Sequence, residues 1–365
     1  MTVPGERYQP MEGQHIINGA DVHVWLKELR AKITASHGEN VVLIGELPAT
    51  PHDEVIKYIS SDSKELDMVF DFDTFMAGND WNSPLHERKH VAMPAFKDAV
   101  TKVQNYLDSS GKTWPITFLE SHDFPRSVSH FGPGTGKHHQ QAAKMLAMLS
   151  ATLSGTLFIY QGQELGMSNV PATWRREDFR DKSVLRYFDE IDHEHPGDAA
   201  MKKEALNGAL RYGRDNARTP VQWSDAPFGG FTTVEPWISV NDNFVALNAA
   251  DQTADETSIF YFWRKMIRLR AEYPALLRRG RFAMLDSGDK IFAFCKTHHS
   301  ASHEILVLLN FSDEQMELSA PVCGLLGPSE VLVSNAVSEG SSMNAHLQPW
   351  EGTALLRPAS NHALA

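Results

Sequence analysis

The chain has 365 residues, of which 42% are hydrophobic and 22% are charged. This balance is ordinary for a globular protein and excludes a mostly disordered or fibrous chain. The length suits one large domain followed by a smaller one. Because 46 acidic side chains face 34 basic ones, the formal net charge is -12. The overall field therefore repels phosphate backbones and anionic lipid, so we expect no nucleic-acid partner and no membrane partner.

Cysteine usage and the apolar runs indicate the cellular compartment. The only cysteines are Cys295 and Cys323, which are too few for a disulfide framework but leave one disulfide open. A reducing, cytoplasmic location is expected. No apolar run approaches the roughly 18 to 20 residues that a membrane helix needs. Residues 1–16 contain no apolar segment of the kind that a secretory signal carries.

Short apolar runs alternate with helical patterns along the first half of the chain. The spacing of apolar residues from Ala20 predicts a helix with Asn18 or Asp21 as its N-cap. Further helices are predicted over residues 96–107 and 140–153. Strands that alternate with helices at this spacing indicate βαβ units and a parallel sheet, either doubly wound or closed as a barrel. The predicted strands, which read as buried on both faces, are residues 41–45, 68–72, 114–119 and 155–160.

The composition and periodicity of the sequence change twice in the second half of the chain. Residues 166–236 are rich in Arg, Asp, Gly and Pro and show little periodicity, which is typical of a functional loop or a linker. An amphipathic pattern then predicts a helix over residues 259–277. Beyond Gly280, alternating apolar runs punctuated by Gly, Ser and Asp predict a small antiparallel β domain. These runs are residues 281–285, 290–295, 304–311, 336–340 and 353–358.

Residues 86–90 read HERKH and match the HExxH zinc signature, in which two imidazoles one helical turn apart bind the metal. Pro84 and Pro94 leave room only for a short helix, and the segment is strongly charged. A solvated, charged helix start is the preferred interpretation, a zinc protease is the alternative, and no metal or cofactor is expected. Two further groups of histidines could suggest a metal site, namely His138 and His139, and His298, His299 and His303. Adjacent histidines on polar loops are more often surface residues than ligands.

Carboxylates follow two of the predicted strands. Glu46 comes directly after the first strand, whose apolar neighbours favour a protonated carboxyl suited to a general acid. Asp123 follows the third strand, with His122 beside it. The C-terminal ends of parallel strands meet at one edge, where two carboxyl groups facing one pocket can cleave a glycosidic bond. The alternative interpretations are a helix N-cap for Asp123 and a surface ion pair for Glu46.

Several longer stretches resemble a known family. FLESHDFPRSVSHFG, residues 118–132, is similar to the FLENHDQPRxVSRFG segment of α-glucosidases in the α-amylase superfamily of glycoside hydrolases. VVLIGELP, residues 41–48, resembles the strand that carries the general acid of that family. TLFIYQGQELGMSNV, GRDNARTPVQWSDAPFGGFTT and EPWISVNDNF are also close to family stretches and occur in the family order. The members that the chain resembles are fungal maltases and isomaltases and bacterial oligo-1,6-glucosidases.

This resemblance implies an enzyme that acts by a retaining mechanism on the non-reducing end of maltose-like or isomaltose-like oligosaccharides. Glu46 matches the general acid/base of the family. Asp123 matches the carboxylate that holds sugar hydroxyls, and His122 matches its hydrogen-bonding partner. Arg214, the first arginine of RDNAR, matches a residue that closes the pocket around the non-reducing end.

The implied fold is an α/β (β/α)8 TIM barrel over residues 1–280, followed by a C-terminal antiparallel β-sandwich over residues 281–365. The resemblance begins just after the fourth barrel strand, so the apolar runs correspond to strands 5 to 8, the second half of the barrel. The GFRxDV motif that carries the family nucleophile does not occur in the sequence. We therefore expect a truncated chain that is inactive alone and whose open sheet edge pairs with a complementary N-terminal half.

Some features differ from the family pattern or leave alternatives open. Ser121 stands where the family usually has Asn, and Phe124 stands where it usually has Gln. A non-catalytic binding or partner protein of the same fold remains an alternative, as does an isomerase or hydrolase of sucrose or trehalose type. The preference between α-1,4 and α-1,6 linkages depends largely on the residue after the nucleophile, so it stays open.

Overall fold

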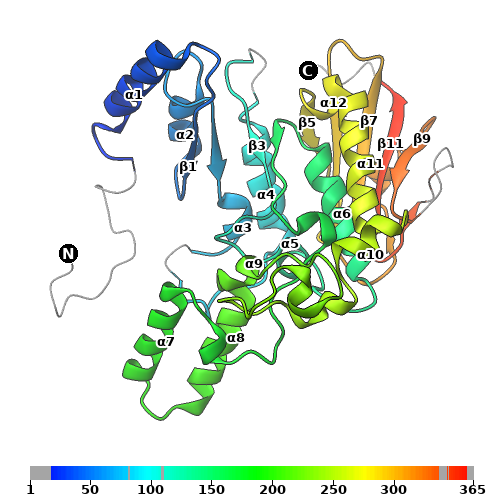
Figure 1. Cartoon of the computed structure of the whole chain (residues 1–365). Coiled ribbons are helices and arrows are strands. Elements are labelled where there is room, and N and C mark those ends of the chain that lie inside the picture. Colours follow the sequence, from blue (N-terminus) through cyan, green and yellow to red (C-terminus); the bar gives the residue numbers. More distant parts are fainter. Residues whose placement is uncertain (1–17, 81–82, 108–110, 337–342, 344, 360–365) are drawn as a thin grey trace.

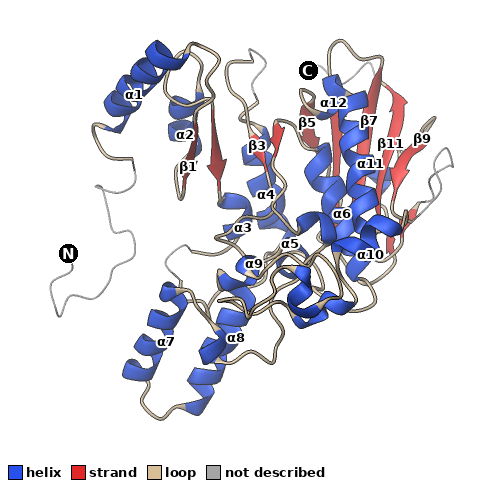
Figure 2. Ribbon diagram, viewed as in Figure 1, coloured by secondary structure: helices blue, strands red, loops and turns tan. Residues whose placement is uncertain are grey.

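The computed structural model describes residues 18–80, 83–107, 111–336, 343 and 345–359. Parallel strands with their helices occupy the first half of the chain, a helical hairpin projects from the middle, and an antiparallel sheet closes the C-terminal part (Figure 1). Figure 2 shows the same division by secondary structure, with long loops between the hairpin and the sheet. In the described ranges, no helix is both long and apolar enough to cross a membrane.

The four predicted strands are present and parallel, but all four are shorter than predicted. They form two pairs, β1 (Ile44–Leu47) with β2 (Met68–Asp71) and β3 (Ile116–Thr117) with β4 (Thr156–Leu157). Strand β2 lies beside β3, where the ring centroids of Phe70 and Phe118 are 4.9 Å apart. Strand β3 pairs over only two residues because residues 118–120 leave the ladder for the loop that carries Asp123.

The first strand is not buried on both faces, so that prediction was wrong. Val42 is 57% exposed and Ile44 is 42% exposed. Helix α1 (Val22–His37) begins after Asp21 as predicted, but it contains no buried residue and its Trp25 is 66% exposed. The physical reason is that β1 has only β2 as a neighbour among the described residues, so no further strand covers its other edge.

The predicted helices over residues 96–107 and 140–153 are confirmed, with bounds shifted by up to three residues toward the N-terminus. Helix α6 (His139–Thr152) is buried along most of its length because it packs between the parallel strands and the C-terminal sheet, beside α11 (Ile259–Glu272). The predicted helix over 259–277 is divided, since Pro274 starts a new helix, α12 (Pro274–Leu277). The remaining helices of the first half are α2 (His52–Ile59), α3 (Asp73–Met76), α4 (Met93–Gln104) and α5 (Ser127–His130).

Residues 166–236 are more structured than predicted. Helices α7 (Lys182–Glu194) and α8 (Ala199–Tyr212) form a hairpin with its own apolar cluster (Figure 1). The missed signals are two aspartate N-caps, Asp181 and Asp198, whose side chains accept hydrogen bonds from backbone N–H groups of the first turns. Shorter elements follow or precede them, namely α9 (Asp215–Arg218), α10 (Ala249–Ala254) and 3-10 turns at Gln163–Leu165, Arg176–Asp178, Pro227–Gly230 and Asp242–Val245.

The predicted antiparallel β domain is confirmed as a five-stranded sheet in the order β5-β6-β7-β11-β9. One face packs on α6 and α11, and the other is covered by the small pair of β8 and β10 with α13 (Ala320–Cys323), rather than by a second full sheet as a sandwich would have. Both cysteines are free thiols, so the disulfide is not formed. Residues 337–340 of one predicted run lie outside the described residues. The strands are β5 (Arg281–Met284), β6 (Ile291–Thr297), β7 (His303–Asn310), β8 (Met316–Glu317), β9 (Glu330–Ser334), β10 (His346–Leu347) and β11 (Gly352–Pro358).

Candidate active site

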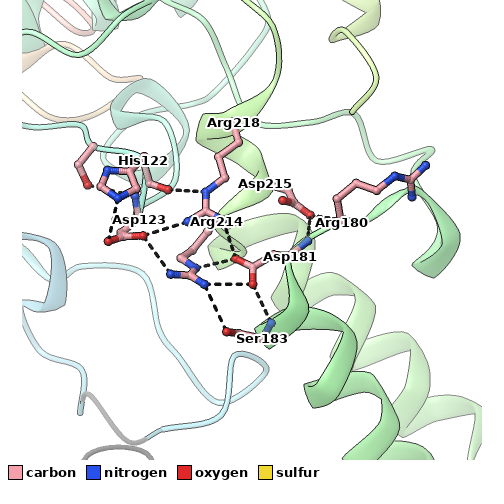
Figure 3. Close-up of polar contacts among 9 residues, drawn as sticks. His122, Asp123, Arg180, Asp181, Ser183, Arg214, Asp215 and Arg218 are labelled. Atoms are coloured by element: carbon pink, nitrogen blue, oxygen red, sulfur yellow. Dashed lines mark hydrogen bonds and ion pairs between the residues drawn. The ribbon is translucent and has the colours of Figure 1, made fainter. Parts of the chain in front are cut away.

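Four charged side chains form a closed ring next to the loop that follows β3 (Figure 3). Arg214 places Nη1 3.1 Å from Asp123 Oδ1 and Nε 2.6 Å from Asp181 Oδ2. Arg218 places Nη2 3.0 Å from the same Asp123 oxygen and Nη1 3.2 Å from the same Asp181 oxygen. Two carboxylates thus alternate with two guanidinium groups, and we call this set the charged ring.

Local structure explains how the charged ring assembles. Arg214 is the N-cap of α9 and Arg218 is its last residue, and side chains four residues apart lie on the same face of a helix. Asp181 caps the N-terminus of α7. Asp215, which is fully buried, accepts hydrogen bonds from the backbone N–H groups of Arg180 (2.7 Å) and Asp181 (2.9 Å) and so ties α9 to the start of α7.

Burial differs between the two carboxylates of the ring. Asp181 is 4% exposed; burial alone would raise the pKa of its carboxyl, but hydrogen bonds from Arg214 and Ser183 outweigh this and lower the pKa. The same contact with Asp181 raises the pKa of Arg214. The side chain of Asp123 is 29% exposed. A ligand can therefore reach Asp123. Asp181 is too buried for direct contact with a ligand and instead holds the two arginines in place.

A second, fully buried ion pair supports the loop from below. Glu120 accepts a hydrogen bond from Arg126 Nη1 at 3.0 Å and two more from the backbone N–H and hydroxyl of Ser127. The guanidinium of Arg126 lies over the ring of Tyr160, 5.2 Å from its centroid. The ionisable residues at the end of β3 therefore divide into an inner structural pair and an outer pair, His122 and Asp123, that faces solvent.

The structure brings together three of the four residues identified from the sequence. His122 Nε2 lies 3.4 Å from Asp123 Oδ2, its side chain is 60% exposed, and Arg214 contacts the other oxygen of Asp123. Glu46 lies within β1 rather than after it, and it is exposed instead of enclosed by apolar neighbours, because the first strand is uncovered. No hydrogen bond or ion pair within the described ranges joins Glu46 to the charged ring.

Strand register indicates where the Glu46 side chain points. Glu46 is paired with Phe70 across the parallel strands β1 and β2, and paired residues project to the same face of a sheet. The Phe70 ring packs against Phe118 and Phe158. Glu46 thus projects to the face of the strands that holds the phenylalanine cluster, and β3 from this cluster leads into the loop of Asp123.

The sequence did not identify two members of the charged ring. Arg218 is the second arginine of the same RDNAR motif, and its spacing of four residues from Arg214 could have indicated it. Asp181 could have been found from the D-K-S start of helix α7, a typical N-cap pattern.

The histidine clusters do not form metal sites in the part of the chain that the structure describes. Residues 86 and 87 of HERKH lie in a turn and 88–90 are not helical, so the predicted helix start is wrong and the two imidazoles are not one helical turn apart. His86 Nδ1 instead lies 2.6 Å from the hydroxyl of Tyr187. His139 lies in helix α6 rather than on a loop. No group of three or more His, Cys, Asp or Glu residues suited to a metal occurs among the described residues.

Comparison with known proteins places this geometry in a family. The family model described as "Alpha amylase, catalytic domain" matches residues 2–280. The chain is 36% identical to an α-glucosidase of Candida albicans over 325 residues, which are 88% of this chain and 56% of that protein. It is 32% identical to an oligo-1,6-glucosidase of Bacillus cereus over 343 residues, 93% of this chain and 59% of that protein.

Solved structures agree with the sequence comparisons. Trehalulose synthase MutB from Pseudomonas mesoacidophila MX-45 matches with a TM-score of 0.81 at 31% identity, covering 93% of this chain and 59% of that one. Isomaltulose synthase from Erwinia rhapontici NX5 matches with a TM-score of 0.82 at 31% identity and the same coverage. The chain thus spans a little under three fifths of the length of these relatives. The matched family model, the identities and the shared fold show that the chain belongs to the α-amylase catalytic domain family of glycoside hydrolases.

Proposed function

We propose that this chain carries part of the active site of a retaining α-glucosidase that acts on the non-reducing end of α-linked gluco-oligosaccharides in the cytoplasm. The observation that supports this most is the accessibility of Asp123. Its carboxylate is held by Arg214 and Arg218 and is still exposed to a ligand. Charge-assisted hydrogen bonds that sugar hydroxyls donate to a fixed carboxylate are strong and directional, so Asp123 is suited to hold a glucose unit. Relatives named α-glucosidase and oligo-1,6-glucosidase support the substrate class.

In this proposal each site residue has a distinct role. Glu46 is the general acid/base that protonates the leaving oxygen and then activates water. Asp123 holds hydroxyls of the glucose unit, with His122 as its hydrogen-bonding partner. Arg214 limits the pocket at the non-reducing end, because it is anchored on Asp181 and contacts Asp123 from one side.

We further propose that strands β1 to β4 are the second half of a (β/α)8 barrel over residues 1–280, with residues 281–365 as a separate β domain. The uncovered edge of β1 and the exposed Trp25, Val42 and Ile44 support a complementary N-terminal half as the missing neighbour. A retaining mechanism needs a second carboxyl about 5 Å from the acid. In this proposal that carboxyl comes from the complementary half.

Hydrolysis of p-nitrophenyl α-glucoside tests this function. The 365-residue chain alone should show little or no turnover. Addition of the N-terminal half of the Candida albicans relative, refolded together with this chain, should produce turnover. Glu46→Gln should abolish that turnover, whereas the matched change Glu39→Gln at another exposed glutamate should not. Robust turnover by the chain alone that is lost in Glu46→Gln would contradict the complementary half, and no turnover in any mixture would contradict the function.

A second candidate is a sucrose isomerase, because solved structures similar to this chain include trehalulose and isomaltulose synthases. The two activities differ in their products from sucrose. A complemented enzyme that releases glucose and fructose is a hydrolase, whereas one that accumulates trehalulose or isomaltulose is an isomerase. Chromatography of the sucrose reaction mixture distinguishes them.

A further inference from the structure

A cavity of about 430 Å³ lies where the loop before α6 meets the C-terminal sheet. One wall comes from residues 132–138, and the other comes from Lys290, residues 311–313 and Trp350. A volume of this size is in the range of small-ligand sites. No residue of the charged ring lines the cavity, so it is separate from the candidate active site.

The aromatic wall of the cavity has an unusual backbone. Trp350 adopts a left-handed φ of 54°, which is rare for a bulky residue and is found preferentially at ligand-binding sites. Its backbone N–H donates to the carbonyl of Ser312 at 3.0 Å, and its own carbonyl accepts from Asn335 Nδ2 at 2.9 Å. The loop is therefore held in this conformation, with the Phe311 and Trp350 ring centroids 6.2 Å apart.

Two polar groups in the wall have no hydrogen-bond partner among the described residues. Trp350 is 8% exposed, and its indole Nε1 is buried without an acceptor. His138 Nε2 is also buried without a partner. A buried indole N–H usually finds an acceptor, and both unpartnered atoms belong to residues that line the cavity.

The charges around the cavity are balanced. Lys290 pairs with Glu314, and the exposed Lys137 and Asp313 have opposite signs. Such a balance does not select an anion. A pyranose presents apolar C–H faces to aromatic rings and hydroxyl groups to mixed donors and acceptors, and this matches a wall of Phe311 and Trp350 with a polar rim.

We propose that this cavity is a second binding site for a neutral gluco-oligosaccharide, distinct from the charged ring. The choice of ligand rests on the proposed function. A bound oligosaccharide contacts both the loop of residues 132–138 and the C-terminal sheet, so it joins the two parts of the chain. It also keeps substrate near the enzyme without occupying the catalytic pocket.

Calorimetric titration with maltotriose tests the proposal on the full chain. In an Asp123→Asn background, which weakens the grip at the charged ring, maltotriose binding should persist. Adding Lys137→Ala and Asp313→Ala should weaken that binding at least fivefold. The matched pair Lys203→Ala and Asp225→Ala, at exposed positions outside the cavity, should leave it unchanged. Thermal melting checks that each variant is folded, and a tryptophan fluorescence change on binding should disappear in Trp350→Phe.

Three results would overturn the proposal. The first is equal affinity of the cavity and control variants for maltotriose. The second is complete loss of binding in Asp123→Asn alone, which would assign all binding to the charged ring. The third is tighter binding of inorganic phosphate than of maltotriose. Because none of these measurements requires turnover, a failure of the glucosidase assay remains distinguishable from a failure of the cavity proposal.

Discussion

Arg218 contacts both the side chain of Asp123 and the backbone beside it. Its Nη2 lies 3.0 Å from Asp123 Oδ1, and its Nε donates to the carbonyl oxygen of His122 at 2.8 Å. Only the planar fork of a guanidinium can reach these acceptors and Asp181 at the same time. Arg218 therefore fixes the loop on which the proposed sugar contacts depend.

Arg218→Lys should loosen this loop while keeping the positive charge. A lysine has one nitrogen and cannot span the three acceptors, so hydrogen–deuterium exchange in the peptide that contains residues 121–125 should become several-fold faster. Mass spectrometry measures this exchange. Arg176→Lys, which alters a comparable ion-pair network on α7, is the control and should leave that peptide unchanged. Equal exchange in wild type and Arg218→Lys would show that the loop is held by other contacts.

Asp181→Asn should destabilise the chain by about 1 to 3 kcal/mol, because it removes a buried negative charge that two arginines contact. Asparagine is also a good N-cap, so the cap of α7 is kept. Urea unfolding measures the change. Asp198→Asn, at the N-cap of α8, should cost much less, because no arginine among the described residues forms an ion pair with Asp198. Similar losses at both positions would mean that the arginine contacts of Asp181 add no stability beyond that of an ionised N-cap.

His130 should make the chain less stable in mild acid. Its pKa is lowered to about 4 by burial, and its Nε2 lies 3.0 Å from the carbonyl of Phe75, to which the neutral ring donates. In the unfolded chain a histidine has a pKa near 6.5. Between these values the unfolded state binds the extra proton, so stability should fall as pH drops from about 6.5 to 4, by on the order of 3 kcal/mol.

His130→Gln should flatten this part of the pH profile, because glutamine keeps an N–H donor but does not titrate. Urea unfolding at several values of pH between 4 and 7 is the measurement. His193→Gln, at an exposed position on α7, is the control and should keep the wild-type slope. A slope unchanged in His130→Gln would contradict the assignment.

Lys296 should make the stability of the chain depend on pH in alkaline solution. Its Nζ is fully buried and contacts Ser154 and the carbonyl of Gly280, and burial together with nearby Arg270 holds the pKa of Lys296 well below the usual range. The unfolded state therefore binds more protons up to about pH 10.5, and stability should rise with pH across this window. Lys296→Met should remove the rise, so wild type should gain relative to the variant between pH 7 and 10.

Urea unfolding at pH 7, 8.5 and 10 checks this expectation. Lys203→Met at an exposed position is the control and should follow the wild-type profile. At pH 7 the methionine variant should be at least as stable as wild type, since burying an apolar side chain requires neither the loss of a proton nor the desolvation of a charge. Parallel pH profiles of wild type and Lys296→Met would mean that Lys296 is charged in the folded chain.

The elements that the sequence predicted well are those with strong local patterns. Helices α4, α6 and α11 have apolar residues at helical spacing, and β6 and β7 have long apolar runs. The hairpin of α7 and α8 was missed although its aspartate caps were visible and α7 is amphipathic, with Val184, Phe188 and Ile191 buried. Burial of β1 was wrongly predicted, since an apolar run cannot show whether a neighbouring strand is present.

The sequence by itself determined the alternation of strands and helices, the His122–Asp123 pair at the end of β3, and a set of motifs long enough to resemble a family. Only the tertiary structure decided which charges meet. Asp123 and Arg214 are separated by 91 residues and Asp123 and Arg218 by 95, so no local spacing encodes their contact. The same holds for the orphaned indole of Trp350 and the exposure of Glu46, because packing and burial depend on which distant segments fold against one another.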